Sequence, residues 1–234
     1  MTMSARRPSQ PRQLDLTYRS WGGRRAGAGR KRSAQGGVPH RARPPLASRF
    51  PVHVTLRLGP ALPSLRHPCC APAVAHALRT GAARDGFRLI HFCVTSNHLH
   101  LLCEATCQRA LSAGLRGFSI RLARALNARL QRRGPVLAER YHARILRTPL
   151  EVQRALLYVL NNQRRHEREK RSQLAADWAD RFSSGPWFDG WRARPHNGRP
   201  PPSFMPRPHT WLLRAGWRRH GLLHLAAVPG GAAG

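Results

Sequence analysis

The sequence predicts an α+β protein in which helices cover an antiparallel sheet. Short segments in which apolar and polar residues alternate with a period of two predict strands. Longer segments between them carry apolar residues at helical spacing. Two of the strand segments are separated by only a few turn-forming residues, which is typical of an antiparallel hairpin.

Residues 52–58 are expected to form the first strand. Valine and leucine alternate there with His53, Thr55 and Arg57. Because successive side chains of a strand point to opposite faces, we expect a half-buried strand with its apolar face in the core.

A hairpin and a short last strand are expected further along the chain. Residues 87–94 and 98–104 are the two apolar arms of the hairpin, and Thr95-Ser96-Asn97 forms the turn between them. Residues 141–146 fit a short additional strand.

Three helices are expected between and after these strands. Residues 69–84 are rich in alanine, and residues 107–133 place leucine and phenylalanine side chains on one face. The third helix starts at Thr148-Pro149-Leu150-Glu151, where the threonine is the N-cap and the glutamate completes a capping box. We expect this helix to run to about Lys170.

The order β-α-β-β-α-β-α predicts a ferredoxin-like or RRM-like antiparallel sheet with helices on one face. This core is expected over residues 49–171. Residues 1–48 lack hydrophobic periodicity and are expected to be a disordered basic N-terminal arm. Residues 172–234 are expected to be an irregular, Trp/Pro-rich basic C-terminal extension that lies over the core or over a ligand.

The charge balance predicts a polyanionic partner. The chain has 41 Lys and Arg against 10 Asp and Glu, a formal net charge of +31, and such a field attracts phosphate. A solvated charge run is an equally open interpretation of the arm. The residues expected to contact nucleic acid lie in the arm and on the second helix, which has no carboxylate: Arg24, Arg25, Arg30, Lys31, Arg32, Arg116, Arg121 and Arg124.

The composition disfavours several other classes of protein. No apolar run of the roughly 18 residues needed to span a membrane occurs, and no apolar segment typical of a secretory signal follows the first residues. The five cysteines are odd in number and include no Cys-x-x-Cys pair, so a disulfide framework and a four-cysteine zinc site are disfavoured. A cytoplasmic, nucleoid-associated location is expected.

His98 and His100 are the first candidate site residues. Two residues apart on a strand, they face the same side of the sheet, while Leu99 and Leu101 face the other. Paired neutral imidazoles suit a divalent cation. In a chain with 13 histidines, a chance His-x-His pair is the competing interpretation.

Tyr158 is the second candidate. Helical spacing places it opposite the apolar stripe of its helix, near Arg154, and in line with Asn162 four residues later. A tyrosine at the rim of the core is the alternative. An asparagine oxygen beside two imidazoles fits Mg²⁺ or Mn²⁺ acting on a phosphate. The phenol would then attack the phosphodiester and form a phosphotyrosine, with nearby arginines holding the strand.

These residues resemble the single-tyrosine HUH transposases, and among them the REP-associated tyrosine transposases. The motif is His98-Leu99-His100 followed on a helix by Tyr158-x-x-x-Asn162, and the similarity spans roughly residues 50–168. It implies an RRM-like core that cleaves and joins single-stranded, often hairpin-bearing DNA through a 5′-phosphotyrosine with Mg²⁺ or Mn²⁺.

The resemblance also implies roles for single residues. His98 and His100 are metal ligands, Tyr158 is the nucleophile, and Asn162 supplies the third metal-binding side chain. Support for the active site is expected from His142, which lies where relatives have a histidine, and from Arg154. Gln163 stands where members often have proline, and insertion-sequence relatives have glutamine in place of Asn162.

Other functions remain open from the sequence. A non-catalytic RRM-like nucleic-acid-binding protein, or a domesticated transposase-derived DNA-binding protein, would use the same basic residues. The first strand, however, has no Phe or Tyr on which a base could stack. A structural zinc site is disfavoured because no cysteine lies at ligand spacing to the histidine pair. We expect a monomer or a homodimer.

Overall fold

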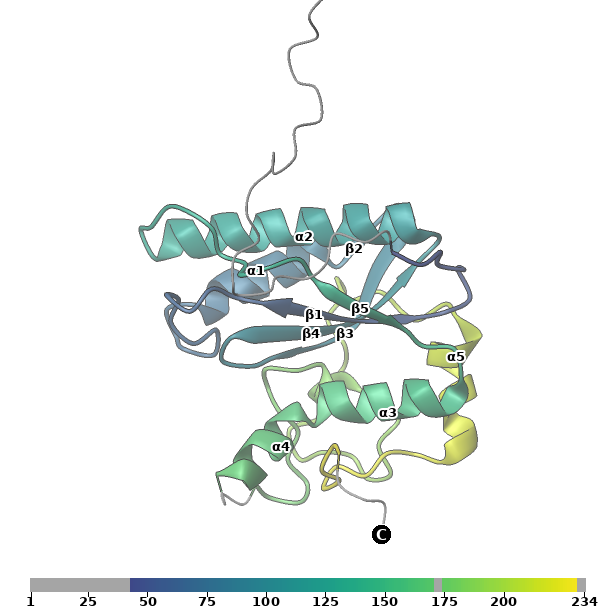
Figure 1. The fold of residues 1–234 in the computed structure, drawn as a ribbon. Helices are drawn as coiled ribbons and strands as arrows, with labels where there is room; N and C mark the ends of the chain where they lie inside the picture. The colour runs from purple at the N-terminus through teal and green to yellow at the C-terminus, as the bar shows by residue number, and fades with distance from the viewer. Residues whose placement is uncertain (1–42, 171–173, 231–234) are drawn as a thin grey trace, which may run out of the picture. The chain divides into compact units, whose positions relative to one another are not determined.

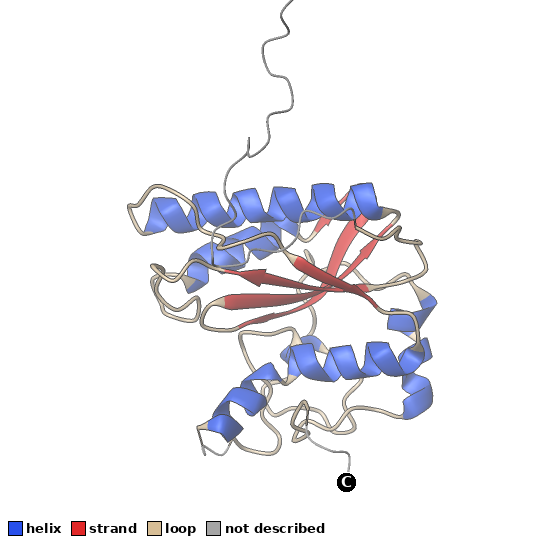
Figure 2. Ribbon diagram, in the orientation of Figure 1, coloured by secondary structure: helices blue, strands red, loops and turns tan. Residues whose placement is uncertain are grey.

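The computed structural model describes residues 43–170 and 174–230. A five-stranded antiparallel sheet has the order β2-β3-β4-β1-β5 and lies between two layers (Figures 1 and 2). Its strands are β1 (Val52–Arg57), β2 (Ala83–Arg84), β3 (Phe87–Val94), β4 (His98–Ala105) and β5 (His142–Ile145). The predicted α+β class, strands and hairpin are confirmed, and the two-residue β2 is an addition.

The helices follow the predicted order, with one break. They are α1 (Ala71–Gly81), α2 (Gln108–Arg129), α3 (Pro149–Leu160), α4 (Asn162–Glu169) and α5 (Trp211–Arg214), with 3-10 turns η1 (Gly185–Trp187) and η2 (Gly216–His220). Within the described ranges, no helix combines the length and apolar character that crossing a membrane requires.

Helices α1 and α2 cover one face of the sheet, as predicted. Leu111, Leu115 and Phe118 of α2 are buried in the same core as Val52 and Val54 of β1. A side chain at Gly114 would overlap the ring of Phe87, and one at Gly81 would meet Phe118. These glycines let α2 lie close to both the sheet and α1.

The prediction that all helices lie on one face is wrong for α3. Val152, Leu156 and Val159 form a second core on the opposite face, together with Ile90 and Leu102 of the sheet. The physical reason is that β3 and β4 are buried almost continuously along their length, and strands buried on both faces need a cover on each side.

The chain after residue 174 completes this second cover. Trp191, Leu212 and Trp217 are buried against α3, although most of the segment is irregular. Ser183 pairs with Cys93 of β3 in an isolated bridge, and buried Asp180 forms an ion pair of 2.7 Å with Arg66. The predicted extension is therefore irregular in backbone but forms part of the core.

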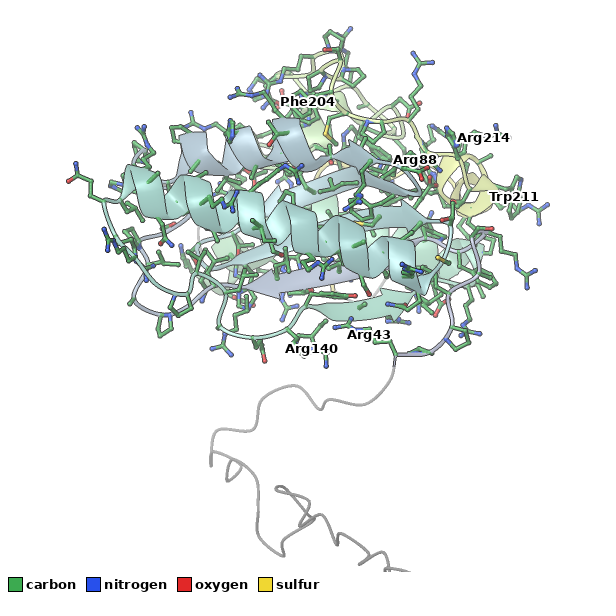
Figure 3. All side chains as sticks on the ribbon, turned by 90° about the horizontal axis from the view of Figure 1, so that it is seen from above. Arg43, Arg88, Arg140, Phe204, Trp211 and Arg214 are labelled. Carbon is green, nitrogen blue, oxygen red and sulfur yellow. The ribbon has the colours of Figure 1, made fainter. Side chains whose placement is uncertain are left out.

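Part of the expected N-terminal arm also contacts the core. Leu46 is 7% exposed, and the Arg43 guanidinium lies 3.5 Å from the centre of the Tyr141 ring. Figure 3 shows Arg43 where the chain reaches the edge of the sheet. The rest of the arm, residues 1–42, lies outside the described residues.

The predicted helix 148–170 starts as expected but divides at Asn161. The Thr148 hydroxyl accepts from the Glu151 amide at 3.2 Å, and the Glu151 carboxylate accepts from the Thr148 amide at 3.1 Å, which is the capping box. At Asn161 the side-chain amide donates to Leu225 at 2.9 Å and to Ala227 at 2.8 Å. These contacts to the C-terminal segment fix Asn161 outside helical geometry, and α4 begins anew.

Candidate functional site

The histidine pair lies on the sheet face covered by α3. In the register of β4 against β1, His98 pairs with Arg57 and His100 pairs with Thr55. Leu99 and Leu101 are buried in the core on the α1 and α2 side. The predicted division of this strand into a histidine face and a leucine face is confirmed.

The two imidazoles lie parallel with their Nδ1 atoms engaged. Their ring centres are 6.2 Å apart and the planes differ by 11°. His98 Nδ1 donates to Asn97 Oδ1 at 2.7 Å, and His100 Nδ1 shares a hydrogen bond of 3.3 Å with the Thr55 hydroxyl. Such contacts fix ring orientation and leave Nε2 of each ring for a ligand.

Tyr158 contacts this histidine face from α3. Its ring meets His100 edge-on, with centres 5.1 Å apart and planes at 89°. The side chain is half-buried and packs against the second core. The expectation that Tyr158 points away from the apolar side of its helix is therefore wrong: it lies at the rim of the core, as the alternative predicted, and also beside the histidine pair.

His53 also belongs to this cluster, although it was not predicted as a site residue. Its ring centre lies 5.6 Å from His100 and 5.6 Å from Tyr158, and its Nε2 is buried without a hydrogen-bond partner. The signal was present in the sequence, because alternation along the first strand places His53 on the same face as Thr55. The pairing of that face with His100 depends on register, which alternation does not give.

All three histidines are held in the neutral form. Burial lowers the pKa of His100 to about 3, and repulsion from neighbouring basic groups, His53 first among them, acts in the same direction whenever they are protonated. Burial, and to a lesser degree Arg144, lowers the pKa of His53 to about 4. The pKa of His98 is also lowered, chiefly by burial and then by Arg57. Neutral imidazoles are the form that binds metal.

His91, elsewhere on this sheet face, makes the stability of the fold depend on pH. It contacts Phe188 and Ser184, and burial lowers its pKa to about 4 from 6.5. The unfolded chain therefore binds more protons between these values, and stability present above pH 6.5 is lost as the pH falls. Between pH 7 and pH 5, the free energy of unfolding is expected to fall in both proteins. The fall is expected to be smaller in His91→Gln than in wild type, by on the order of 1 kcal/mol, as measured by urea unfolding. Exposed His220→Gln is the control, and equal losses for both variants would contradict the assignment.

A pocket of about 860 Å³ opens beside Tyr158. Its wall includes His53, Arg144 and Arg154, and residues 228–230 of the C-terminal segment border it. Arg144 is also paired with Glu151 at 3.1 Å. The structure therefore brings Arg154 to the Tyr158 site, and adds Arg144, which the sequence analysis did not select.

Asn162 is the first residue of α4, just after the break in the predicted helix. The continuous helix that aligned it with Tyr158 is interrupted at Asn161, so the four-residue spacing no longer implies a shared helix face. The side chain is buried, and its Oδ1 has no hydrogen-bond partner. In residues 43–170 and 174–230, no three or more His, Cys, Asp or Glu residues form a cluster that could hold a metal ion.

His142 lies near the cluster at the edge of the sheet. It pairs with Thr55 in the register of β5 against β1, in line with His100 on the next strand. Its side chain is 58% exposed, and Nε2 lies 3.4 Å from the Glu139 carboxylate. His142 therefore borders the site.

The predicted nucleic-acid contacts on α2 are remote from Tyr158. Arg116, Arg121 and Arg124 are exposed on α2, which covers the opposite face of the sheet (Figure 1). The structure does not bring them together with the histidines. The predicted contacts in the arm, Arg24, Arg25, Arg30, Lys31 and Arg32, lie outside the described residues.

Comparison with known proteins finds structural similarity alone. No protein-family model and no curated protein matches the chain. One similar solved structure is a REP-associated tyrosine transposase bound to a REP hairpin, with 15% identity, a TM-score of 0.46, and coverage of 63% of this chain and 82% of the other. Another is a Deinococcus radiodurans R1 protein described as a transposase, with 18% identity, a TM-score of 0.36, and coverage of 53% and 92%.

Proposed function

We propose that this chain is a transposase-type enzyme that cleaves and rejoins single-stranded, hairpin-bearing DNA with Tyr158 as the nucleophile. The observation that carries the proposal is the edge-on contact of Tyr158 with His100, 5.1 Å between ring centres, in a cluster of neutral imidazoles. A phenol beside neutral nitrogen ligands, at the wall of a pocket with two arginines, is suited to attack on a phosphodiester.

The proposed reaction is a transesterification, with the protons exchanged through solvent. The Tyr158 oxygen gives up its proton and forms a bond to phosphorus, the bond from phosphorus to the 3′ oxygen breaks, and that oxygen takes up a proton. The product is a 5′-phosphotyrosine and a free 3′ hydroxyl. Attack by a 3′ hydroxyl on the phosphotyrosine runs the same step in reverse and joins strands. Arg144 and Arg154, which line the pocket with Tyr158, hold the phosphodiester by charge.

The side chains that would hold a divalent ion in this proposal are His98, His100 and Asn162. His98 and His100 have their Nδ1 atoms engaged and their Nε2 atoms left for a ligand, and Asn162 has a buried oxygen without a partner. Mg²⁺ or Mn²⁺ held by these three side chains would act as a Lewis acid on the phosphate oxygens.

A non-catalytic RRM-like binding protein is the second candidate, because the basic surface would serve it equally. A sheet that binds nucleic acid directly needs one open face. Here α3 and the C-terminal segment bury that face, with Leu102, Leu156 and Trp217 in one core. The covered sheet favours the enzyme.

The position of a label on the DNA tests the proposal. With Mn²⁺ present, a single-stranded hairpin oligonucleotide labelled at its 3′ end is expected to label the protein on a denaturing gel, because the 5′-phosphotyrosine retains the 3′ fragment. A 5′ label is expected to leave with the free fragment, and EDTA is expected to stop attachment. Tight binding without attachment under any of these conditions would support the binding protein instead.

A further inference from the structure

The layer formed by α1 and α2 is a second basic surface, on the sheet face opposite Tyr158. Figure 3 looks onto this layer, where the two helices lie side by side above the sheet. Neither helix contains Asp or Glu. Of the ion pairs formed by residues 43–170 and 174–230, none involves a residue of α1 or α2. The arginines of these two helices therefore form no ion pair within the described part of the chain.

Two guanidinium groups, one from α2 and one from the neighbouring β2, lie near Gly117 of α2. A Cβ at Gly117 would lie 3.1 Å from Nη1 of Arg121 and 3.7 Å from Nη1 of Arg84. Any larger residue at this position would occupy the space between the two groups. The glycine thus leaves a cradle on the surface, with one arginine from α2 and the other from β2.

Arg84 is held by a hydrogen bond, and the stem of Arg121 lies near the end of α1. Nη1 of Arg84 donates to the carbonyl oxygen of Ala113 at 3.1 Å, which fixes the guanidinium above α2. The Arg121 stem lies over α1, with its Cδ 3.7 Å from the Cβ position of Gly81. Two like charges close together repel each other, and an anion bound between them is attracted to both, which offsets that repulsion.

We propose that the Arg84–Gly117–Arg121 cradle binds a phosphate of the DNA backbone, as a second DNA contact on the face of the protein away from Tyr158. Guanidinium groups match phosphate oxygens in charge and geometry, and the cradle has no feature that reads a base. The choice of DNA as the polyanion rests on the proposed function, whereas the affinity of the cradle for phosphate does not depend on Tyr158. A strand that occupies both sites must pass around the edge of the sheet.

The first test compares substitution of the two cradle arginines with substitution of two other arginines of α2, which removes the same amount of charge. Arg84→Gln/Arg121→Gln in the full chain is expected to weaken binding of a long single-stranded hairpin DNA about tenfold. The slope of log Kd against log salt is expected to fall by about 0.7, the value for one lost phosphate contact on a single strand. The control Arg116→Gln/Arg124→Gln removes two exposed charges from the same helix without touching the cradle, and about a threefold effect is expected.

A second variant tests the site without removing an arginine. Gly117→Glu places a carboxylate between the guanidinium groups and is expected to weaken binding about tenfold, while Gly117→Gln fills the same space without charge and is expected to cost about threefold. Both replace a glycine inside a helix, which favours the helical state, so thermal unfolding temperatures are expected to be maintained.

The outcomes separate the cradle from the nucleophile. Attachment of a short oligonucleotide to Tyr158 at saturating DNA is expected to be unchanged by Gly117→Gln and by Gly117→Glu. Equal losses for the cradle and control pairs, or for Gly117→Glu and Gly117→Gln, would overturn the cradle. Unchanged binding of the long DNA by Arg84→Gln/Arg121→Gln would overturn it as well. A cradle effect in a protein that never attaches covalently would refute the nucleophile and leave the cradle standing.

Discussion

Tyr158→Phe is expected to abolish covalent attachment of the protein to DNA, a loss of at least about a thousandfold in the rate of adduct formation. The substitution removes only the phenolic oxygen that forms the bond to phosphorus. The ring, which contacts His53 and His100 edge-on, is retained, so the cluster keeps its packing. Binding of the uncleaved oligonucleotide is expected to change less than twofold. The rate is measured by quenching reactions with a 3′-labelled hairpin oligonucleotide at successive times and separating them on a denaturing gel. Filter binding measures affinity.

Tyr141→Phe is the matched control for this experiment. Tyr141 is also half-buried, and its hydroxyl forms a hydrogen bond of 3.0 Å with Ser112 of α2, on the side of the sheet away from the histidines. Its removal is expected to leave attachment at the wild-type rate. Attachment that persists in Tyr158→Phe and disappears in Tyr141→Phe would show that the nucleophile has been assigned to the wrong tyrosine.

The histidine face of the sheet was predictable from the sequence because the information is local. Alternation along a single strand separates His98 and His100 from Leu99 and Leu101, whatever the strand pairs with. The membership of His53 was not predictable in this way. It depends on the pairing of Thr55 with His100, a contact between residues 45 positions apart.

The position of the third helix shows the same limit. Its start was predictable from the capping box, which involves only Thr148 and Glu151. Its end was not, because the residue that interrupts it is neither proline nor glycine. Asn161 leaves helical geometry while its side chain binds carbonyl groups more than 60 residues away, those of Leu225 and Ala227.

The second cover of the sheet was the least predictable part of the fold. Residues 174–230 have no long periodic segment, so their composition indicated an appendage. In the structure Trp191 and Trp217 are buried against α3, and the polar contacts that hold this segment join it to distant strands. One such contact is the hydrogen bonding of Glu104 to Thr210.

Glu104→Ala is accordingly expected to destabilise the fold by about 3–5 kcal/mol. The carboxylate is 1% exposed and forms an ion pair of 2.8 Å with Arg88. It also accepts from the Thr210 amide and from the Thr210 hydroxyl, both at 2.8 Å. Its loss leaves a partly buried guanidinium and a buried amide without partners, and such orphaned groups cost more than the contact itself contributes. Urea unfolding at pH 7 measures the change.

Asp189→Ala isolates the effect of burial from that of the ion pair. Asp189 is paired with Arg218 at 2.9 Å, nearly the same distance, but its side chain is 83% exposed. An exposed pair contributes about 0–1 kcal/mol because water screens and replaces it. Limited proteolysis of Glu104→Ala is expected to cut first within residues 174–230, since Thr210 is the point at which that segment joins β4. Equal destabilisation by both variants would mean that the pairing of charges, and not the buried hydrogen bonds, attaches the second cover to the sheet.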